Sequence, residues 1–155
     1  MKPLNINEIL EETAETLRCF DWMEGIPVIV EEKADPDNQT EMEIAQQSLC
    51  VVVAENGFEP TVQTPDAGNP TLVIGKVTIV VSVFEKPVIN RADKDAMTLK
   101  ALSRKIGKEL AWCQAEGMAA PLWLRRISPI SLFRVEGDQD AIITRDVEFT
   151  TKSTL

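Results

Sequence analysis

The fold is decided by the stretch Val77-Thr78-Ile79-Val80-Val81-Ser82-Val83-Phe84. Almost every residue in it is β-branched or aromatic, and such residues favour the pleated, packed surface of a sheet. Side chains alternate between the two faces of a strand, so one face of this run is entirely apolar and the other is mixed. The apolar face carries Val77, Ile79, Val81 and Val83, and the mixed face carries Thr78, Val80, Ser82 and Phe84. The run therefore predicts a central strand that packs on a core helix.

On the C-terminal side of this strand, an amphipathic helix is expected over residues 98–112. Gly117 is a typical stop signal after it. The apolar stripe of this helix consists of Leu99, Leu102, Ile106, Leu110 and Cys113. On the N-terminal side, residues 50–54 predict a buried strand that ends at the turn signal Asn56-Gly57. Residues 58–70 are rich in Pro, Thr, Asp, Gly and Asn, which predicts a long hairpin loop that connects the two strands.

The remaining elements are less prominent. Asn5 and Glu8 have the spacing of a capping box at the start of a helix over 6–19, and Gly75 indicates a bulge. Also expected are a strand over 26–31, a helix over 40–49, strands within 121–135, a strand over 141–150 and a frayed tail over 152–155. These patterns predict a single α+β domain over residues 1–155. Its mainly antiparallel sheet, of about four to five strands, would pack against one long helix and one or two shorter helices.

Composition limits the possible functions. The chain of 155 residues has 25 acidic and 16 basic residues, a formal charge of -9, which argues against a general nucleic-acid binder. It has no histidine, so the usual general base and the commonest metal ligand are missing. Its three cysteines are far apart and lie within apolar patterns, which predicts buried free thiols. An odd count without a recognisable secretory leader predicts a soluble protein in a reducing compartment.

No motif in the sequence predicts catalysis, a cofactor or a metal. Asp138-Gln139-Asp140 lacks the further oxygen donors of a calcium loop and is interpreted as a turn. Gly75-Lys76 lacks the rest of a phosphate-binding loop, and no two cysteines have metal-ligand spacing. A site built from two carboxylates remains open, because two acids can meet from anywhere in the chain.

Two helices are expected to carry rows of charge. The first helix has an acidic row and the helix over 98–112 has a basic row. The rows consist of Glu8, Glu12 and Glu15, and of Lys100, Arg104 and Lys108. The plain interpretation is two solvated faces, with local pairs such as Lys105 and Glu109. The alternative is that the acidic row meets the basic row of a neighbouring copy.

The order of elements resembles that of the tail terminator and tail completion proteins of tailed bacteriophages. The resemblance lies in Gly75–Glu85, in the connector Pro87–Arg91, in the helix Thr98–Trp112 and in the closing strand Asp146–Thr150. It covers much of the chain as a pattern and includes no catalytic motif.

The resemblance implies a non-enzymatic virion protein of a phage or prophage, assembled in the bacterial cytoplasm. It would form a hexameric ring on the end of the tail tube, stop tail growth and offer a surface to the head connector. DNA would pass through the ring without sequence-specific contacts, and no membrane would be involved. The loop 61–70 and the connector 86–91 would contact partners. The contact residues expected there are Asp66, Asn69, Lys86, Asn90 and Arg91.

Two other classes remain possible from the sequence. One is a small cytoplasmic enzyme or ligand-binding α+β domain, whose site would use carboxylates with Arg or Lys and would need a deep pocket. The other is an interaction adaptor that stays monomeric until its partner is present. A ring-forming protein would need complementary surfaces on the same subunit.

Overall fold

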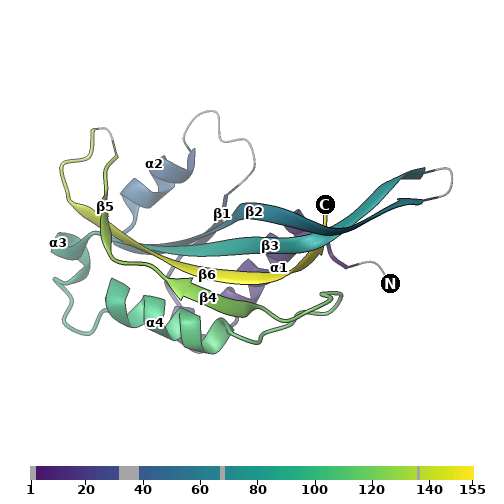
Figure 1. Ribbon diagram of the computed structural model, residues 1–155. Coiled ribbons are helices and arrows are strands. Elements are labelled where there is room, and N and C mark those ends of the chain that lie inside the picture. Colours follow the sequence, from purple (N-terminus) through teal and green to yellow (C-terminus); the bar gives the residue numbers. More distant parts are fainter. Residues whose placement is uncertain (1–2, 32–38, 67–68, 136) are drawn as a thin grey trace.

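The computed structural model describes residues 3–31, 39–66, 69–135 and 137–155. These residues form one six-stranded sheet with helices on both faces (Figure 1). In chain order the elements are α1 (Ile6–Arg18), the 3-10 turn η1 (Asp21–Met23), β1 (Val28–Val30), α2 (Gln39–Gln46), β2 (Leu49–Asp66), β3 (Asn69–Glu85), α3 (Pro87–Asn90), α4 (Leu99–Leu110), β4 (Trp123–Ile127), β5 (Ser131–Phe133) and β6 (Ile142–Thr154).

The sheet is mixed and mostly antiparallel, which confirms the α+β class. Its strand order is β1-β2-β3-β6-β4, and β5 pairs with the other end of β6. Among the strand pairs of the described residues, only β1 and β2 run parallel, with Val28 opposite Val51. The described residues contain six strands where about four to five were expected, and α1 is as prominent as the one long helix predicted. In this strand order, β1 and β4 lie at opposite edges of the sheet.

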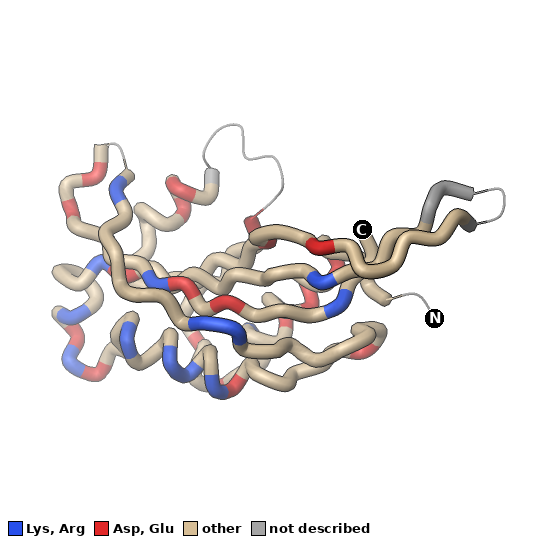
Figure 2. The backbone as a smooth tube through the Cα atoms, viewed as in Figure 1, with Lys and Arg blue, Asp and Glu red and all other residues tan. Residues whose placement is uncertain are grey.

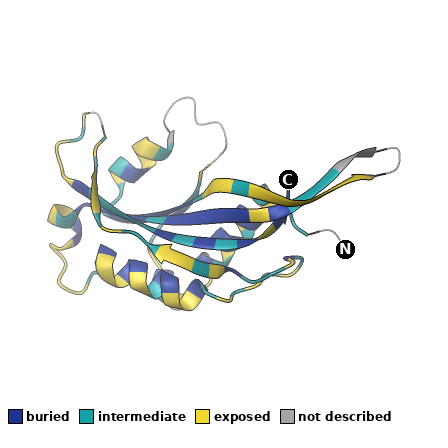
Figure 3. Ribbon diagram, viewed as in Figure 1, coloured by how far each residue is buried: buried dark blue, intermediate teal, exposed yellow. Residues whose placement is uncertain are grey.

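The main core lies between the sheet and the pair α1 and α4. The alternation predicted for β3 is confirmed, since Val77, Ile79, Val81 and Val83 are all fully buried on this face. Leu102 and Ile106 of α4 and Leu17 of α1 pack against them. Each fully buried side chain of this size contributes roughly 1.5–3 kcal/mol to folding. Figure 3 shows this buried layer along the centre of the sheet.

A smaller layer covers part of the other face. Ile44 of α2 and Ile142 of β6 pack there against Cys50, Val52 and Phe84. Phe133 of β5 meets Phe84 edge-to-face, with ring centroids 4.8 Å apart. α2 ends at Gln46, three residues before the expected end, because the chain enters β2 at Leu49.

The expected hairpin connection between β2 and β3 is confirmed, but the expected end of the strand at Asn56-Gly57 is wrong, and residues 58–66 and 69–70 belong to strands where a loop was expected. β2 and β3 continue as a paired hairpin as far as Asp66 and Asn69. Three irregularities in β2 absorb the turn-forming residues, and Gly57 sits in the first of them with φ +108°. Pairing with a long partner strand has overridden the local turn preference.

Gly75 lies opposite Pro60, next to the second irregularity. A Cβ at Gly75 would lie 2.2 Å from the carbonyl oxygen of Glu59. Only glycine allows β2 to approach this closely, so the expected irregularity is confirmed but falls on β2.

The C-terminal ends of α4 and β6 also differ from expectation. α4 ends at Leu110, and the next residue but one, Trp112, has φ +68° and donates its N–H to the carbonyl of Leu122 at 2.7 Å. Gly117 lies in the loop beyond and does not end the helix. Residues 152–154, expected to fray, belong to β6, where Ser153 pairs with Gly75 and is buried.

Candidate functional site

The acidic row of α1 is partly occupied by local contacts. The N–H of Glu8 donates to Asn5 Oδ1 at 2.8 Å, and the N–H of Asn5 donates to Glu8 Oε1 at 3.3 Å, which confirms the capping box. Glu15 forms an ion pair with Arg18 at 2.7 Å. Glu12 is half-buried. Glu8 therefore caps a helix, while Glu15 remains a solvent-facing acid beside a basic neighbour.

The basic row of α4 is exposed along its whole length. Lys100, Arg104 and Lys108 form no ion pair with any other described residue. The local pair expected between Lys105 and Glu109 is absent from the described contacts. Lys105 instead lies over the ring of Trp22, with Nζ 5.5 Å from the ring centroid.

The structure does not bring the two rows together within one chain. α1 covers the part of the sheet near β1 and β2, and α4 covers the part near β6, β3 and β4. Both rows face solvent, and Figure 2 shows the basic positions of α4 and β4 on one side of the molecule. Any pairing between the rows would have to join two subunits.

A pair of exposed tryptophans lies beside the basic row. Trp112 follows α4 and Trp123 begins β4, and their rings meet edge-to-face with centroids 5.0 Å apart. Their exposed fractions are 66% and 56%. We call these two residues the Trp pair. The sequence interpretation missed it, although the spacing of four that joins Lys100, Arg104 and Lys108 continues to Trp112.

The opposite edge of the sheet has a cleft of about 540 Å³. Ile6, Leu10 and Ala54 contribute apolar surface to it, and Glu31 and Glu55 contribute exposed carboxylates. We call this hollow the acidic cleft. A second hollow, of about 460 Å³, lies in the segment from Leu132 to Ile142.

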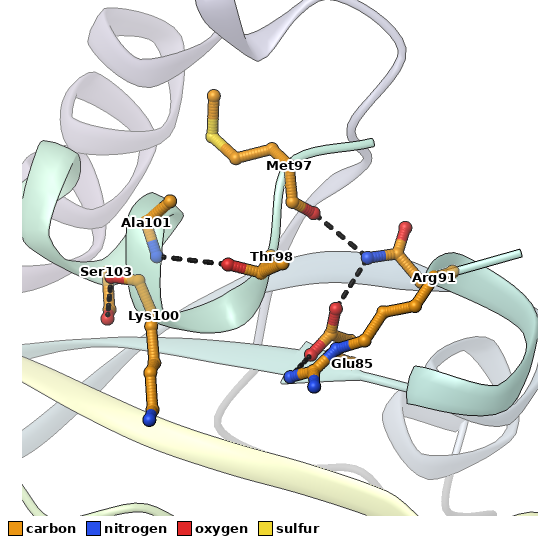
Figure 4. A network of polar contacts seen from close by, with 8 residues as sticks. Glu85, Arg91, Met97, Thr98, Lys100, Ala101 and Ser103 are labelled. Atoms are coloured by element: carbon orange, nitrogen blue, oxygen red, sulfur yellow. Dashed lines mark hydrogen bonds and ion pairs between the residues drawn. The ribbon is translucent and has the colours of Figure 1, made fainter. Parts of the chain in front are cut away.

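The connector after β3 is an internal joint. Glu85 is fully buried, and its carboxylate accepts hydrogen bonds from Asn90 Nδ2 at 2.5 Å and from Arg91 Nη2 at 3.0 Å. Asn90 also donates to the carbonyl of Met97 at 2.9 Å, just before Thr98 caps α4 (Figure 4). Asn90 is therefore occupied inside the fold, and only Arg91 keeps a half-exposed side chain.

Lys86 is also internal. Its ammonium group donates to the carbonyl of Ala45 in α2 and forms an ion pair with Asp138 Oδ2 at 2.6 Å. Lys86 and Asn90 are buried, so the structure removes both from the expected contact residues. Asp66 and Asn69 face each other across the far end of the β2–β3 hairpin.

The described residues contain no group of three or more acidic or cysteine side chains that could hold a metal ion. Asp138 forms its ion pair with Lys86 inside the fold. The cysteines do not all follow the prediction of buried thiols. Cys50 is buried, and burial, followed by the nearby Glu43, raises the pKa of its thiol to about 12. Cys19 is exposed.

The comparisons with known proteins do not identify a family. No protein-family model matches the chain, and no curated protein matches its sequence. Within the described residues, no helix is long and apolar enough to cross a membrane.

Proposed function

We propose that the chain is a non-enzymatic structural subunit of a phage or prophage virion. It assembles with copies of itself into a ring that caps the tail tube, and it joins the tube to the head connector. The proposal combines the resemblance in the sequence with one structural observation, the projecting hairpin of β2 and β3.

Among the described residues, the outer part of this hairpin pairs with itself, apart from the carbonyl of Val73 at its base, which accepts the N–H of Leu155 at 3.0 Å. Residues 62–66 and 69–73, which we call the ribbon, extend beyond the last residues of β6 that pair with β3 (Figure 1). Residues 59–65 are exposed, and Val62 is an exposed apolar side chain among them. A two-stranded ribbon without a covering layer is only marginally stable in water. Such a ribbon suits a protein that buries it against a partner.

The sequence of the ribbon supports an assembly role over uncontrolled strand addition. Pro65 in β2 and Pro70 in β3 lie within the ribbon and Pro60 lies just before it, and proline cannot donate a backbone hydrogen bond to an added strand. The free edges are therefore blunted. Contacts through the exposed side chains of residues 62–65 are consistent with docking on a preformed tube.

Light scattering over a concentration series tests the proposal, with and without the tail-tube protein of the same genome. A ring-sized assembly, alone or on tubes, is expected. A variant in which residues 64–72 are replaced by Asn-Gly closes the hairpin at the pair Gln63 and Val73. We expect this variant to fold and to form rings, but to bind tubes weakly. Met42→Ser, which removes an exposed apolar side chain from α2, outside the two segments expected to contact partners, serves as the control.

A strict monomer that ignores tubes at every concentration contradicts the proposal. That outcome favours the enzyme or ligand-binding alternative, for which one of the two hollows would be the site. A monomer that binds a different virion protein would instead support the adaptor class.

A further inference from the structure

The exposed Trp pair contributes little to the stability of its own subunit. A tryptophan stabilises a protein mainly by removing 150–250 Å² of surface from water, and both rings remain more than half exposed. Tryptophan is also among the residues most enriched at the centres of protein interfaces. The stabilisation that these rings can provide is therefore realised outside the subunit.

The backbone at Trp112 supports the same conclusion. Its φ of +68° is the only positive value at a non-glycine residue in the described chain. Glycine takes this conformation freely, whereas a residue with a Cβ is strained in it by about 1 kcal/mol or more. The strain orients an exposed indole toward Trp123, which indicates a contact role for the side chain.

The acidic cleft matches the Trp pair in chemistry. Lys108 precedes Trp112 by four residues and Arg125 follows Trp123 by two, and both of these cationic side chains are exposed. The cleft has apolar surface for the rings and the carboxylates of Glu31 and Glu55 for the cations. Opposite charges favour contact between a surface that carries the Trp pair and a surface that carries the acidic cleft, and they disfavour contacts between two like surfaces.

We propose that the Trp pair of one copy inserts into the acidic cleft of the next copy, so that subunits join head to tail. The Trp pair is at the β4 edge of the sheet and the cleft is at the β1–β2 edge. Four strand spacings separate these edges, roughly 19 Å. A contact between two different patches is heterologous, and its repetition closes into a ring when the rotation allows.

The two edges also make direct strand pairing between copies unfavourable. β1 has only three residues, and β4 has an irregularity at Arg125. Short or irregular edge strands resist the addition of another strand. Side chains, and not backbone pairing, therefore join the subunits. This inference deepens the proposed ring and rests on it, because it names the contact between neighbouring subunits.

The first experiment separates assembly from folding. Trp112→Gly removes the indole side chain and also relieves the strain of the positive φ. The subunit should therefore remain folded, with unchanged or higher thermal stability. Its association constant should fall at least 30-fold, about the effect of losing a tryptophan at the centre of an interface. Leu132→Ala, which removes another exposed apolar side chain, is the matched control and should assemble normally.

The second experiment tests the head-to-tail geometry. Glu31→Arg with Glu55→Arg should disable the cleft and leave the Trp pair intact. Asp93→Arg with Asp95→Arg changes the charge equally in the exposed connection before α4 and is the control. Trp112→Gly and the cleft variant should each be monomeric alone. Mixed in equal amounts, the two variants should form heterodimers and no larger assembly. Each heterodimer contains only one functional Trp pair and one functional cleft, and the two are already in contact.

The outcomes distinguish this inference from the proposed function. Rings that form normally from Trp112→Gly or from the cleft variant overturn the inference and leave the ring itself intact. A mixture that stays monomeric also overturns the head-to-tail contact. Saturable quenching of the tryptophan fluorescence by an oligonucleotide at moderate salt, seen in wild type and lost in Trp112→Gly, would show that the Trp pair binds nucleic acid instead, which overturns the inference. A wild-type chain that is monomeric with and without tubes overturns both proposals.

Discussion

Glu85 and Lys86 are consecutive residues that tie together opposite faces of the sheet. The Glu85 carboxylate holds Asn90 and Arg91, on the face covered by α1 and α4. The Lys86 ammonium holds the carbonyl of Ala45 and the carboxylate of Asp138, on the face covered by α2. Because side chains alternate along a strand, two adjacent charges at the end of β3 reach both layers.

The pair of Lys86 and Asp138 should make part of the stability depend on pH. The Lys86 ammonium, followed by the N–H of Asp140, holds the pKa of the Asp138 carboxyl below its ordinary value of 3.8. A carboxyl with a lowered folded-state pKa stabilises the fold above its unfolded pKa, and this contribution disappears as the pH falls through the folded value. Urea unfolding of wild type and Asp138→Asn should therefore differ near neutral pH and converge below 3.8.

Asp140→Asn is the control for this experiment, because the side chain of Asp140 takes no part in the pair and its N–H remains. It should follow the wild-type pH dependence. A constant difference between wild type and Asp138→Asn at every pH would show that the ion pair does not titrate as the structure indicates.

Removing the buried carboxylate of Glu85 should lower the free energy of unfolding far more than removing the exposed carboxylate of Glu59. Glu85→Ala leaves Asn90 and Arg91 without their acceptor and should lower the free energy of unfolding by about 3 kcal/mol. Glu59→Ala removes the exposed ion pair with Lys76 and should change it by less than about 1 kcal/mol. Equilibrium urea denaturation measures both. Equal effects would contradict a structural role for Glu85.

Gly75 should not tolerate a side chain. In Gly75→Ala the new Cβ would meet the backbone of Glu59 and Pro60, which can move only if β2 moves. The expected loss of unfolding free energy is about 1–3 kcal/mol, typical of overpacking. Lys76→Ala, at the exposed neighbouring position, should have little effect. Thermal unfolding of the two variants is sufficient to compare them, and equal midpoints would refute the close approach.

The cysteines should react in order of exposure and pKa. A thiol with a pKa of about 12 has only about one thiolate in ten thousand molecules at pH 8, and burial also blocks reagents. Cys50 should therefore resist alkylation until the protein unfolds, whereas the exposed Cys19 should react quickly. Mass spectrometry after timed alkylation locates the label, and Cys19→Ser should remove the fast reaction. Rapid labelling of Cys50 in the folded protein would contradict its buried position.

The candidate surfaces were only partly visible in the sequence. The exposure of Lys100, Arg104 and Lys108 follows from their helical spacing opposite the apolar stripe. Lys86 and Asn90 were also expected to be exposed. The sequence does not distinguish a polar connector residue that faces solvent from one that is buried against a partner inside the fold. Asp138, the partner of Lys86, is far along the chain.

What the sequence determined by itself was local. The capping box of Asn5 and Glu8 and the two faces of β3 were predicted, because hydrogen bonds within one turn and the period of a strand depend only on neighbouring residues. Tertiary structure decided the rest. Pairing with β3 extended β2 through Asn56-Gly57, pairing with β3 also drew residues 152–154 into β6, and the ends of α4 and β4 brought Trp112 to Trp123. Each of these depends on long-range contacts, whose free energy exceeds the small local preferences that a sequence pattern records.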